Sequence, residues 1–364
     1  MEPILIDIIA GARPNFMKIA PIIKAIQERQ GRGSRLRYRL VHTGQHYDAR
    51  MSGDFFAQLG IPVPDVNLEV GSGTQAEQTA TIMTRYEKLL MEKRSDLCLV
   101  VGDVTSTMAC SIAAQKLCVK VAHVEAGIRS GDWSMPEEIN RMVTDAITNY
   151  FFTTSEVANA NLRRSGVSDE KIHFVGNTMI DTLLANMGRL RPPMFWEELA
   201  LESGEYFVLT LHRPANVDDL DQLTGMLTAV AGGCRNLPVV FPIHPRTSKN
   251  LGTSPIPDNI KLVEPQPYLE FNYLVKHAKA VITDSGGITE ETTVMGVPCM
   301  TLRDSTERPE TVTMGTNVLL GTDPTNLKPA LDLLFSGRWK KGDIPPLWDG
   351  KTGQRIAEIL EATL

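Results

Sequence analysis

The residues around Ser285 combine features of a site for a phosphorylated ligand. An apolar run at 280–283 is typical of a buried strand, and Asp284-Ser285-Gly286-Gly287 then leads into helix-like sequence. Paired glycines let the backbone approach a ligand, and the free N–H groups at a helix start favour an anion. Glu290 and Glu291 fall in the first turn of the predicted helix, where a carboxylate could accept a ribose hydroxyl. A structural interpretation stays open, in which the glycines only tighten a turn and the glutamates suit the helix dipole.

Similar polar clusters follow other apolar runs of the chain. They are Gly11-Ala12-Arg13-Pro14-Asn15, Gly102-Asp103-Val104-Thr105-Ser106, His123-Val124-Glu125-Ala126-Gly127, His212-Arg213-Pro214 and His244-Pro245-Arg246. In open parallel sheets, ligands collect beyond the carboxyl ends of the strands. Because the clusters recur at this position, we expect two domains whose polar edges share one cleft.

Strand-like apolar runs alternate with helix-like segments along the whole chain. The predicted strands are 4–9, 37–42, 97–101, 119–124, 150–153, 172–175, 206–211, 238–243, 260–263, 280–283, 298–302 and 317–320. Continuous apolar runs with intervening helices indicate parallel sheets that are covered on both faces. Two successive sets of such units predict two doubly wound α/β domains, with the boundary within 177–205. Residues 351–364 predict a final amphipathic helix.

Composition excludes several classes of protein. The chain has 364 residues and a net charge of −6, which argues against nucleic-acid binding. No apolar run approaches the ~18 residues of a membrane span, so no membrane association is expected. The N-terminal run at 4–10 predicts a first strand rather than a signal peptide. The five cysteines form no CxxC pair and predict buried thiols in a reducing compartment, so we expect a cytoplasmic protein.

Neither a cofactor nor a metal ion is predicted. Residues 71–76 match the loose GxGxxG/A pattern, but they lie in a polar connection rather than after the first strand, and no acidic residue follows at the expected strand end. The Gly350-Lys351-Thr352 segment lacks the remainder of a P-loop, because position 345 is proline. The seven histidines show no metal-ligand spacing.

Ordered segments of the chain resemble the non-hydrolysing UDP-N-acetylglucosamine 2-epimerases from Gly11 to about Gly353. The matching segments are 11–18, 43–46, 102–107, 123–129, 136–141, 175–181, 212–213, 283–288 and 303–310. The resemblance implies a fold similar to the GT-B glycosyltransferases, with two Rossmann-like domains and an active site in the interdomain cleft. Residues 1–177 with the helix at 351–364 would form the N-terminal domain, and 178–350 the UDP-binding domain.

The resemblance implies that C2 of UDP-N-acetylglucosamine is inverted to give UDP-N-acetylmannosamine. UDP is eliminated to leave a 2-acetamidoglucal and is then added back, without a nicotinamide. A base must remove the C2 proton as the C1–O bond breaks. The leaving diphosphate needs cations and N–H donors, and a closing cleft would retain the glycal. The family is usually dimeric, so a homodimer is expected.

The resemblance also assigns roles to residues of this chain. Asp103, Glu125 and Glu137 match the catalytic carboxylates, although the sequence leaves open which is the base and which the acid. The other matches are His212 among the catalytic residues, Arg13, Lys18 and Arg308 at cationic or phosphate-facing positions, Ser285, Gly286 and Gly287 in the pyrophosphate turn, Glu291 at the ribose, and Phe271 in the loop 266–271 against uracil. Glu290 is expected only to start a helix.

Several of these residues have a structural alternative. Asp103 could open the predicted helix 104–117, and Glu137 with Glu138 could start a helix. Lys18 could lie on the solvated face of the predicted helix 14–29, and Phe271 could belong to the core. Four other histidines, His42, His123, His173 and His277, are predicted to be structural.

The chain departs from the family pattern at a few positions. Asn15 stands where many members carry glutamate, and Arg-Pro-Ala-Asn follows His212. Allosteric members of the family bind a second UDP-N-acetylglucosamine with a Gln-His pair and an arginine. The Gln45-His46 pair is present here, but residues 71–75 contain no arginine, so allosteric activation is not expected.

Other functions stay open on the sequence alone. Residues 42–48 also resemble relatives that epimerise UDP-2,3-diacetamido-glucuronic acid, whereas 306–310 favour UDP-N-acetylglucosamine. A GT-B glycosyltransferase, a hydrolysing epimerase and a non-catalytic UDP-sugar sensor are the remaining alternatives. A sensor would predict loss of a carboxylate at 103, 125 or 137, and none is lost.

Overall fold

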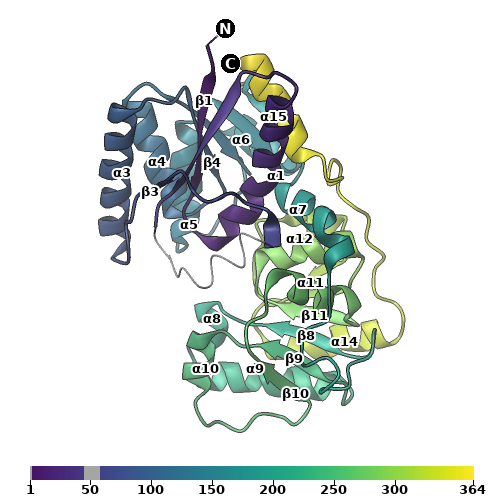
Figure 1. The fold of residues 1–364 in the computed structure, drawn as a ribbon. Coiled ribbons are helices and arrows are strands. Elements are labelled where there is room, and N and C mark those ends of the chain that lie inside the picture. The colour runs from purple at the N-terminus through teal and green to yellow at the C-terminus, as the bar shows by residue number, and fades with distance from the viewer. Residues whose placement is uncertain (1, 45–57) are drawn as a thin grey trace. The chain divides into compact units, whose positions relative to one another are not determined.

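The computed structural model describes residues 2–44 and 58–364, which form two compact units (Figure 1). Unit 1 comprises residues 1–185 and 346–364, and unit 2 comprises residues 186–345. Helix α7 (Thr178–Asn186) lies almost entirely in unit 1. The Thr182 hydroxyl donates to the Met17 carbonyl at 2.6 Å, and the Asp181 carboxylate accepts from the Gly353 N–H at 2.8 Å. These two bonds tie α7 to unit 1, although the sequence-based boundary precedes it.

Unit 1 is built on a seven-stranded sheet in the order β3-β2-β1-β4-β5-β6-β7, and the pairings between neighbouring strands are parallel. Its strands are β1 (Ile4–Ala10), β2 (Leu36–His42), β3 (Val66–Asn67), β4 (Leu97–Val101), β5 (Lys120–Val124), β6 (Tyr150–Thr153) and β7 (Ile172–Phe174). Its other helices are α1 (Arg13–Gln30), α3 (Gln75–Glu92), α4 (Thr105–Lys116), α5 (Pro136–Ala146), α6 (Glu156–Arg164) and α15 (Thr352–Thr363). The sequence missed β3, whose two residues are too short a run to show periodicity.

Unit 2 contains a six-stranded parallel sheet in the order β10-β9-β8-β11-β12-β13. Its strands are β8 (Phe207–Thr210), β9 (Val239–Pro242), β10 (Ile260–Val263), β11 (Ala280–Thr283), β12 (Cys299–Thr301) and β13 (Asn317–Leu319). Its helices are α8 (Pro214–Val217), α9 (Leu220–Gly233), α10 (Pro245–Leu251), α11 (Tyr268–His277), α12 (Gly286–Met295), α13 (Pro309–Thr313) and α14 (Leu327–Phe335).

Both faces of the unit 2 sheet are buried, as its continuous apolar strands predict. Phe207 and Ile282 belong to the core cluster that includes α9 and α14. Their chain neighbours Val208 and Val281 belong to a second cluster that includes α11. Because successive side chains of a strand point to opposite faces, the two clusters cover opposite sides of one sheet. The prediction of a doubly wound α/β fold with parallel sheets is therefore confirmed.

The C-terminal helix packs on the first helix of the chain. Figure 1 shows α15 beside α1, and Arg29 on α1 forms an ion pair with Glu358 on α15 at 2.9 Å. A Cβ at Gly353 would lie 2.5 Å from the Pro21 carbonyl oxygen, so only glycine permits this approach. The terminal segment predicted to be an amphipathic helix is thus a helix of unit 1.

Each sheet has one position where the strand order reverses. In unit 1 the strands on either side are β1 and β4, and in unit 2 they are β8 and β11. Ligands of open α/β sheets bind beyond the carboxyl ends of the strands at this position. The residues that follow these four strands include the clusters at Gly11, Gly102, His212 and Asp284.

Candidate active site

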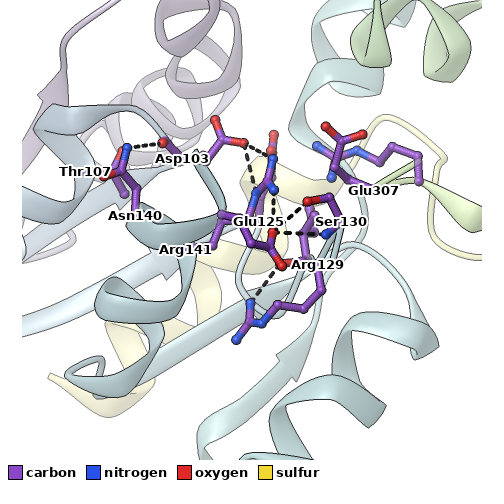
Figure 2. Close-up of polar contacts among 12 residues, drawn as sticks. Asp103, Thr107, Glu125, Arg129, Ser130, Asn140, Arg141 and Glu307 are labelled. Carbon is purple, nitrogen blue, oxygen red and sulfur yellow. Dashed lines mark hydrogen bonds and ion pairs between the residues drawn. The ribbon is translucent and has the colours of Figure 1, made fainter. Parts of the chain in front are cut away.

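In unit 1, Asp103 follows strand β4 and is held by an arginine of helix α5. Arg141 donates from Nε to one oxygen of the Asp103 carboxylate at 3.0 Å, and its Nη2 donates to the same oxygen. The Asn140 amide donates to the Asp103 carbonyl at 2.8 Å (Figure 2). Helix α4 begins after Val104 without a side-chain cap. The alternative in which Asp103 only opens that helix is therefore not what the contacts show.

Glu125 follows the neighbouring strand β5 and adopts an uncommon backbone conformation. Its φ is +69°, in the left-handed region that a non-glycine residue rarely occupies. Its buried carboxylate forms an ion pair with Lys18 Nζ of helix α1 at 2.8 Å. Strained residues cluster at functional sites, which supports a role for Glu125 in the chemistry. Lys18 was expected at a cationic or phosphate-facing position, or else on a solvated helix face. The structure pairs it with Glu125 and leaves its side chain only 12% exposed, and a phosphate contact stays a prediction.

Gly102 makes room for Lys18, and this yields a testable prediction. Its φ is +67°, and an added Cβ would lie 2.9 Å from Lys18 Nζ. We expect Gly102→Ala to lower the free energy of unfolding by about 1–2 kcal/mol because of the left-handed conformation. It should also lower turnover, because Lys18 must move away from Glu125. Urea denaturation and initial rates measure the two effects.

Gly60→Ala is the matched control for this change. Gly60 has a φ of +64°, but no described atom lies within 4 Å of its added Cβ. It should lose similar stability and keep its turnover. Equal turnover in both variants would show that the position of Lys18 is unimportant.

Glu137 and Glu138 in the first turn of α5 have different surroundings. The buried Glu138 carboxylate accepts from the Ser130 and Gly131 N–H groups and forms an ion pair with Arg141 at 2.7 Å. Burial opposes ionisation of Glu138, but these donors hold its pKa below the usual value. Glu138 is therefore the structural member of the pair. Glu137 is only half-buried and stays a candidate acid or base.

His123 is buried and held at both ring nitrogens, as a structural histidine should be. Its Nδ1 lies 2.7 Å from the Asp145 carboxylate, and its Nε2 lies 2.8 Å from the Gly102 carbonyl. Asp145 also accepts from the Gly127 N–H at 3.0 Å and pairs with Arg129. Although burial opposes it, the His123 and Arg129 contacts keep the pKa of Asp145 low. This network links the backbone just before Asp103 to the turn that carries Glu125.

In unit 2, His212 follows strand β8 and is about half exposed at 49%. Its Nδ1 lies 2.8 Å from the carboxylate of Asp284, which is completely buried after strand β11. Asp284 also accepts from the Arg213 N–H at 2.9 Å and from the Asn216 amide at 3.1 Å. Burial would raise the pKa of Asp284, but the bonds from His212, Arg213 and Asn216 hold it below the usual value.

The Ser-Gly-Gly turn begins helix α12, as predicted. Ser285 is the N-cap residue of α12, but its hydroxyl makes no capping hydrogen bond to the helix. A Cβ at Gly287 would meet no described atom within 4 Å, whereas one at Gly286 would touch Arg303 Nη1 at 3.6 Å. This end of α12 can therefore present backbone N–H groups to an anion.

Two expectations about Glu290 and Glu291 were wrong. Helix α12 begins at Gly286, so both residues lie in its second turn rather than its first. Glu290 does not merely start a helix, because its buried carboxylate forms an ion pair with Arg308. The predicted phosphate-facing Arg308 is thus held by a carboxylate of α12.

Glu291 is buried beside α11, and this gives a prediction about pH. Burial raises the pKa of Glu291 to about 7, against the opposing effect of Tyr268 and Asn272. The folded state therefore binds a proton that the unfolded chain releases between pH ~4.5 and ~7, and its stability falls as the pH rises through this range. Glu291→Gln has no such proton. Between pH 5 and pH 8, the free energy of unfolding of Glu291→Gln should therefore rise by about 2–3 kcal/mol relative to that of the parent protein. Urea denaturation at both pH values measures this difference.

Glu290→Gln is the control, because it loses the ion pair with Arg308 instead. It should not reproduce the relative gain at high pH. A constant difference between Glu291→Gln and the parent protein across this range would contradict the assignment.

The remaining predicted residues have mixed outcomes. Phe271 was expected in a loop, but α11 begins at Tyr268, so Phe271 lies in its first turn, where it packs on a core cluster. Arg13 begins α1, and its side chain lies outside the described part. Gln45 and His46 also lie outside the described residues. Asn15 bridges the switch point of unit 1, accepting from the Gly11 N–H at 3.0 Å and donating to the Val101 carbonyl at 3.2 Å.

Sequence reasoning missed two residues of the candidate site. Arg141 and Asp284 stood inside recognised segments without a role, yet each binds a candidate catalytic side chain. Arg141 lies one helical turn after Glu138, a spacing that indicates their ion pair but not the contact with Asp103.

Three properties bear on cofactors and surroundings. Among residues 2–44 and 58–364, no group of three or more histidine, cysteine or acidic side chains is arranged to hold a metal ion. No helix in the same residues is long and apolar enough to cross a membrane. All five cysteines are free thiols, and only Cys118 is exposed.

Known proteins match the chain over nearly its whole length. A family model described as UDP-N-acetylglucosamine 2-epimerase matches residues 28–361. A UDP-N-acetylglucosamine 2-epimerase of Methanocaldococcus jannaschii is 40% identical, with 98% of each chain covered. A UDP-2,3-diacetamido-2,3-dideoxy-D-glucuronate 2-epimerase of Pseudomonas aeruginosa is 39% identical, with 97% of this chain and 98% of that one covered. The crystal structure of the M. jannaschii enzyme with UDP-GlcNAc and UDP matches with a TM-score of 0.87 at 38% identity, covering 99% of this chain and 100% of that one.

Proposed function

The chain belongs to the UDP-N-acetylglucosamine 2-epimerase family, and we propose that it interconverts UDP-N-acetylglucosamine and UDP-N-acetylmannosamine. A base removes the proton from C2 while the C1–O bond breaks, and the electron pair of that bond leaves with UDP. UDP then adds back to C1 of the glycal, and C2 receives a proton on the opposite face. The reaction is an isomerisation without net redox change.

The observation that carries this proposal is the pair of carboxylates after neighbouring strands of unit 1. Asp103 and Glu125 follow β4 and β5, which are paired in parallel, so both lie at one edge of the sheet. Each is held by a cation, Arg141 or Lys18. Two positioned carboxylates are what proton removal at C2 and proton return require. We assign proton removal and proton return at C2 to Asp103, Glu125 and Glu137 as coupled groups. Which of them acts as the base and which as the acid stays a prediction.

Unit 2 supplies the groups that suit the UDP half of the substrate. The open N-terminus of α12 at Ser285-Gly286-Gly287 suits the pyrophosphate, with His212 and Arg308 as further donors. Glu291 suits the ribose, and Phe271 the uracil. These roles and the interdomain cleft that the resemblance implies stay predictions.

Incubation with UDP-N-acetylglucosamine in D2O, followed by NMR, tests the proposal. We expect UDP-N-acetylmannosamine with deuterium at C2 and the UDP linkage intact. Free UDP with free N-acetylmannosamine would identify a hydrolysing epimerase. Unchanged substrate that still binds would identify a sensor and overturn the proposal.

A second candidate substrate calls for a parallel assay, because the P. aeruginosa relative is nearly as similar as the M. jannaschii one. Its name gives UDP-2,3-diacetamido-2,3-dideoxy-D-glucuronate as its substrate. We favour UDP-N-acetylglucosamine because of the form of residues 306–310. A higher kcat/KM for the glucuronate would reverse that preference.

We further propose that the protein is a cytoplasmic homodimer. The free cysteines support a reducing compartment, and the dimer rests on the family resemblance alone. Light scattering coupled to gel filtration measures the oligomeric state, and a monomeric mass would contradict the dimer.

A further inference from the structure

We propose that Asp284 is a positioning residue that fixes which nitrogen of His212 faces UDP, an inference that rests on the proposed function. The Asp284 carboxylate is completely buried, while the His212 side chain is 49% exposed. One ring nitrogen of His212, Nδ1, lies 2.8 Å from Asp284. Nε2 is therefore the nitrogen that remains for a ligand.

The partners of Asp284 explain why this carboxylate stays charged. It accepts from the N–H of His212 at 3.0 Å, from the N–H of Arg213 at 2.9 Å and from Asn216 Nδ2 at 3.1 Å. These donors all belong to the segment that follows strand β8. A buried charge is tolerated only when it is paired and hydrogen-bonded, and these bonds meet that condition.

An ionised carboxylate can only accept hydrogen bonds, so Nδ1 of His212 must carry its proton. Any proton on Nε2 then makes the ring an imidazolium. When the C1–O bond breaks, negative charge develops on the departing phosphate oxygen. With Asp284 in place, the donor that His212 Nε2 offers to this oxygen carries a full positive charge.

Asp284 also links the two anion-binding elements of unit 2. Its carbonyl accepts from Arg213 Nε at 3.1 Å, and the next residue, Ser285, is the N-cap of α12. One residue therefore orients His212 through its side chain and directly precedes the helix end that suits the pyrophosphate. This arrangement suits a role for His212 at the leaving group.

The tautomer of His212 in the parent protein provides a test that does not require turnover. In protein with ¹⁵N-labelled histidine, NMR distinguishes a ring proton on Nδ1 from one on Nε2. We expect the His212 ring to carry its proton on Nδ1, with the signal assigned by its loss in His212→Gln. A neutral ring with the proton on Nε2 would overturn the proposal, whether or not the protein is an epimerase.

Asp284→Asn tests the consequence for the reaction. The amide nitrogen would donate to Nδ1 and move the ring proton to Nε2, leaving a neutral donor. We expect the NMR signature to switch and kcat to fall about 10²-fold, more than the affinity for UDP changes. An unchanged tautomer or an unchanged kcat would contradict the proposal.

Asn216→Ala is the matched control, because it removes another hydrogen bond to the same carboxylate without changing the ring. It should keep the Nδ1 proton. If Asn216→Ala switches the tautomer as Asp284→Asn does, the effect reflects general loosening of the segment, and the proposal fails. The tautomer of the parent protein and that of Asn216→Ala are measured without Asp284→Asn. The proposal can therefore still be tested if Asp284→Asn does not fold.

Discussion

Asp103→Asn is expected to reduce kcat by about 10²–10⁴-fold while the dissociation constant of UDP stays nearly unchanged. The amide cannot take or return a proton, but its oxygen can still accept a hydrogen bond from Arg141, so the fold should persist. UDP is expected to bind unit 2, whereas Asp103 belongs to unit 1. Initial rates and calorimetric titration with UDP measure the two quantities.

Asp96→Asn is the matched control for this change. Asp96 lies at the opposite end of the same strand, β4, where its carboxylate accepts from the Leu5 N–H at 2.7 Å. An amide oxygen can accept that bond equally well, so turnover should stay near that of the parent protein. Retained epimerisation in Asp103→Asn would remove Asp103 from the mechanism. Equal loss in both variants would point to a disturbed sheet instead.

The strands were readable from the sequence because they are buried on both faces. Residues 97–101 and 280–283 were predicted with their observed bounds, since a short apolar run between two helices is typical of a central parallel strand. The carboxyl ends of the parallel strands then placed the polar clusters at one edge of each sheet. The clusters at His212 and Asp284 were therefore expected at a polar sheet edge before the fold was known.

The partners of those residues were beyond the sequence. Arg141 meets Asp103 across 38 positions, and Asn216 meets Asp284 across 68. Such pairs depend on how a helix packs beside a strand end, which no local pattern specifies. The positive φ of Glu125 was equally hidden, because a glutamate gives no sign of a left-handed backbone. Its turn is held by β6, where the Phe152 carbonyl accepts from the Glu125 N–H at 3.0 Å.

The Lys18–Glu125 pair shows how catalysis and stability meet in one contact. The Glu125 side chain is 3% exposed and that of Lys18 is 12%, so neither charge is well solvated. Removing one partner of such a pair leaves the other charge uncompensated, whereas replacing both can be nearly neutral. Single and double changes should therefore separate the two roles of Glu125.

Glu125→Gln is expected to lower kcat by about 10²–10⁴-fold and the free energy of unfolding by about 1–3 kcal/mol. The double variant Lys18→Met with Glu125→Gln should recover most of that stability, because no unpaired charge remains. It should not recover turnover, since no carboxylate is present to exchange a proton with C2. Urea denaturation and D2O exchange at C2 measure the two outcomes. If turnover returned together with stability, Glu125 would be only the structural partner of Lys18, and Asp103 and Glu137 would have to carry both proton transfers.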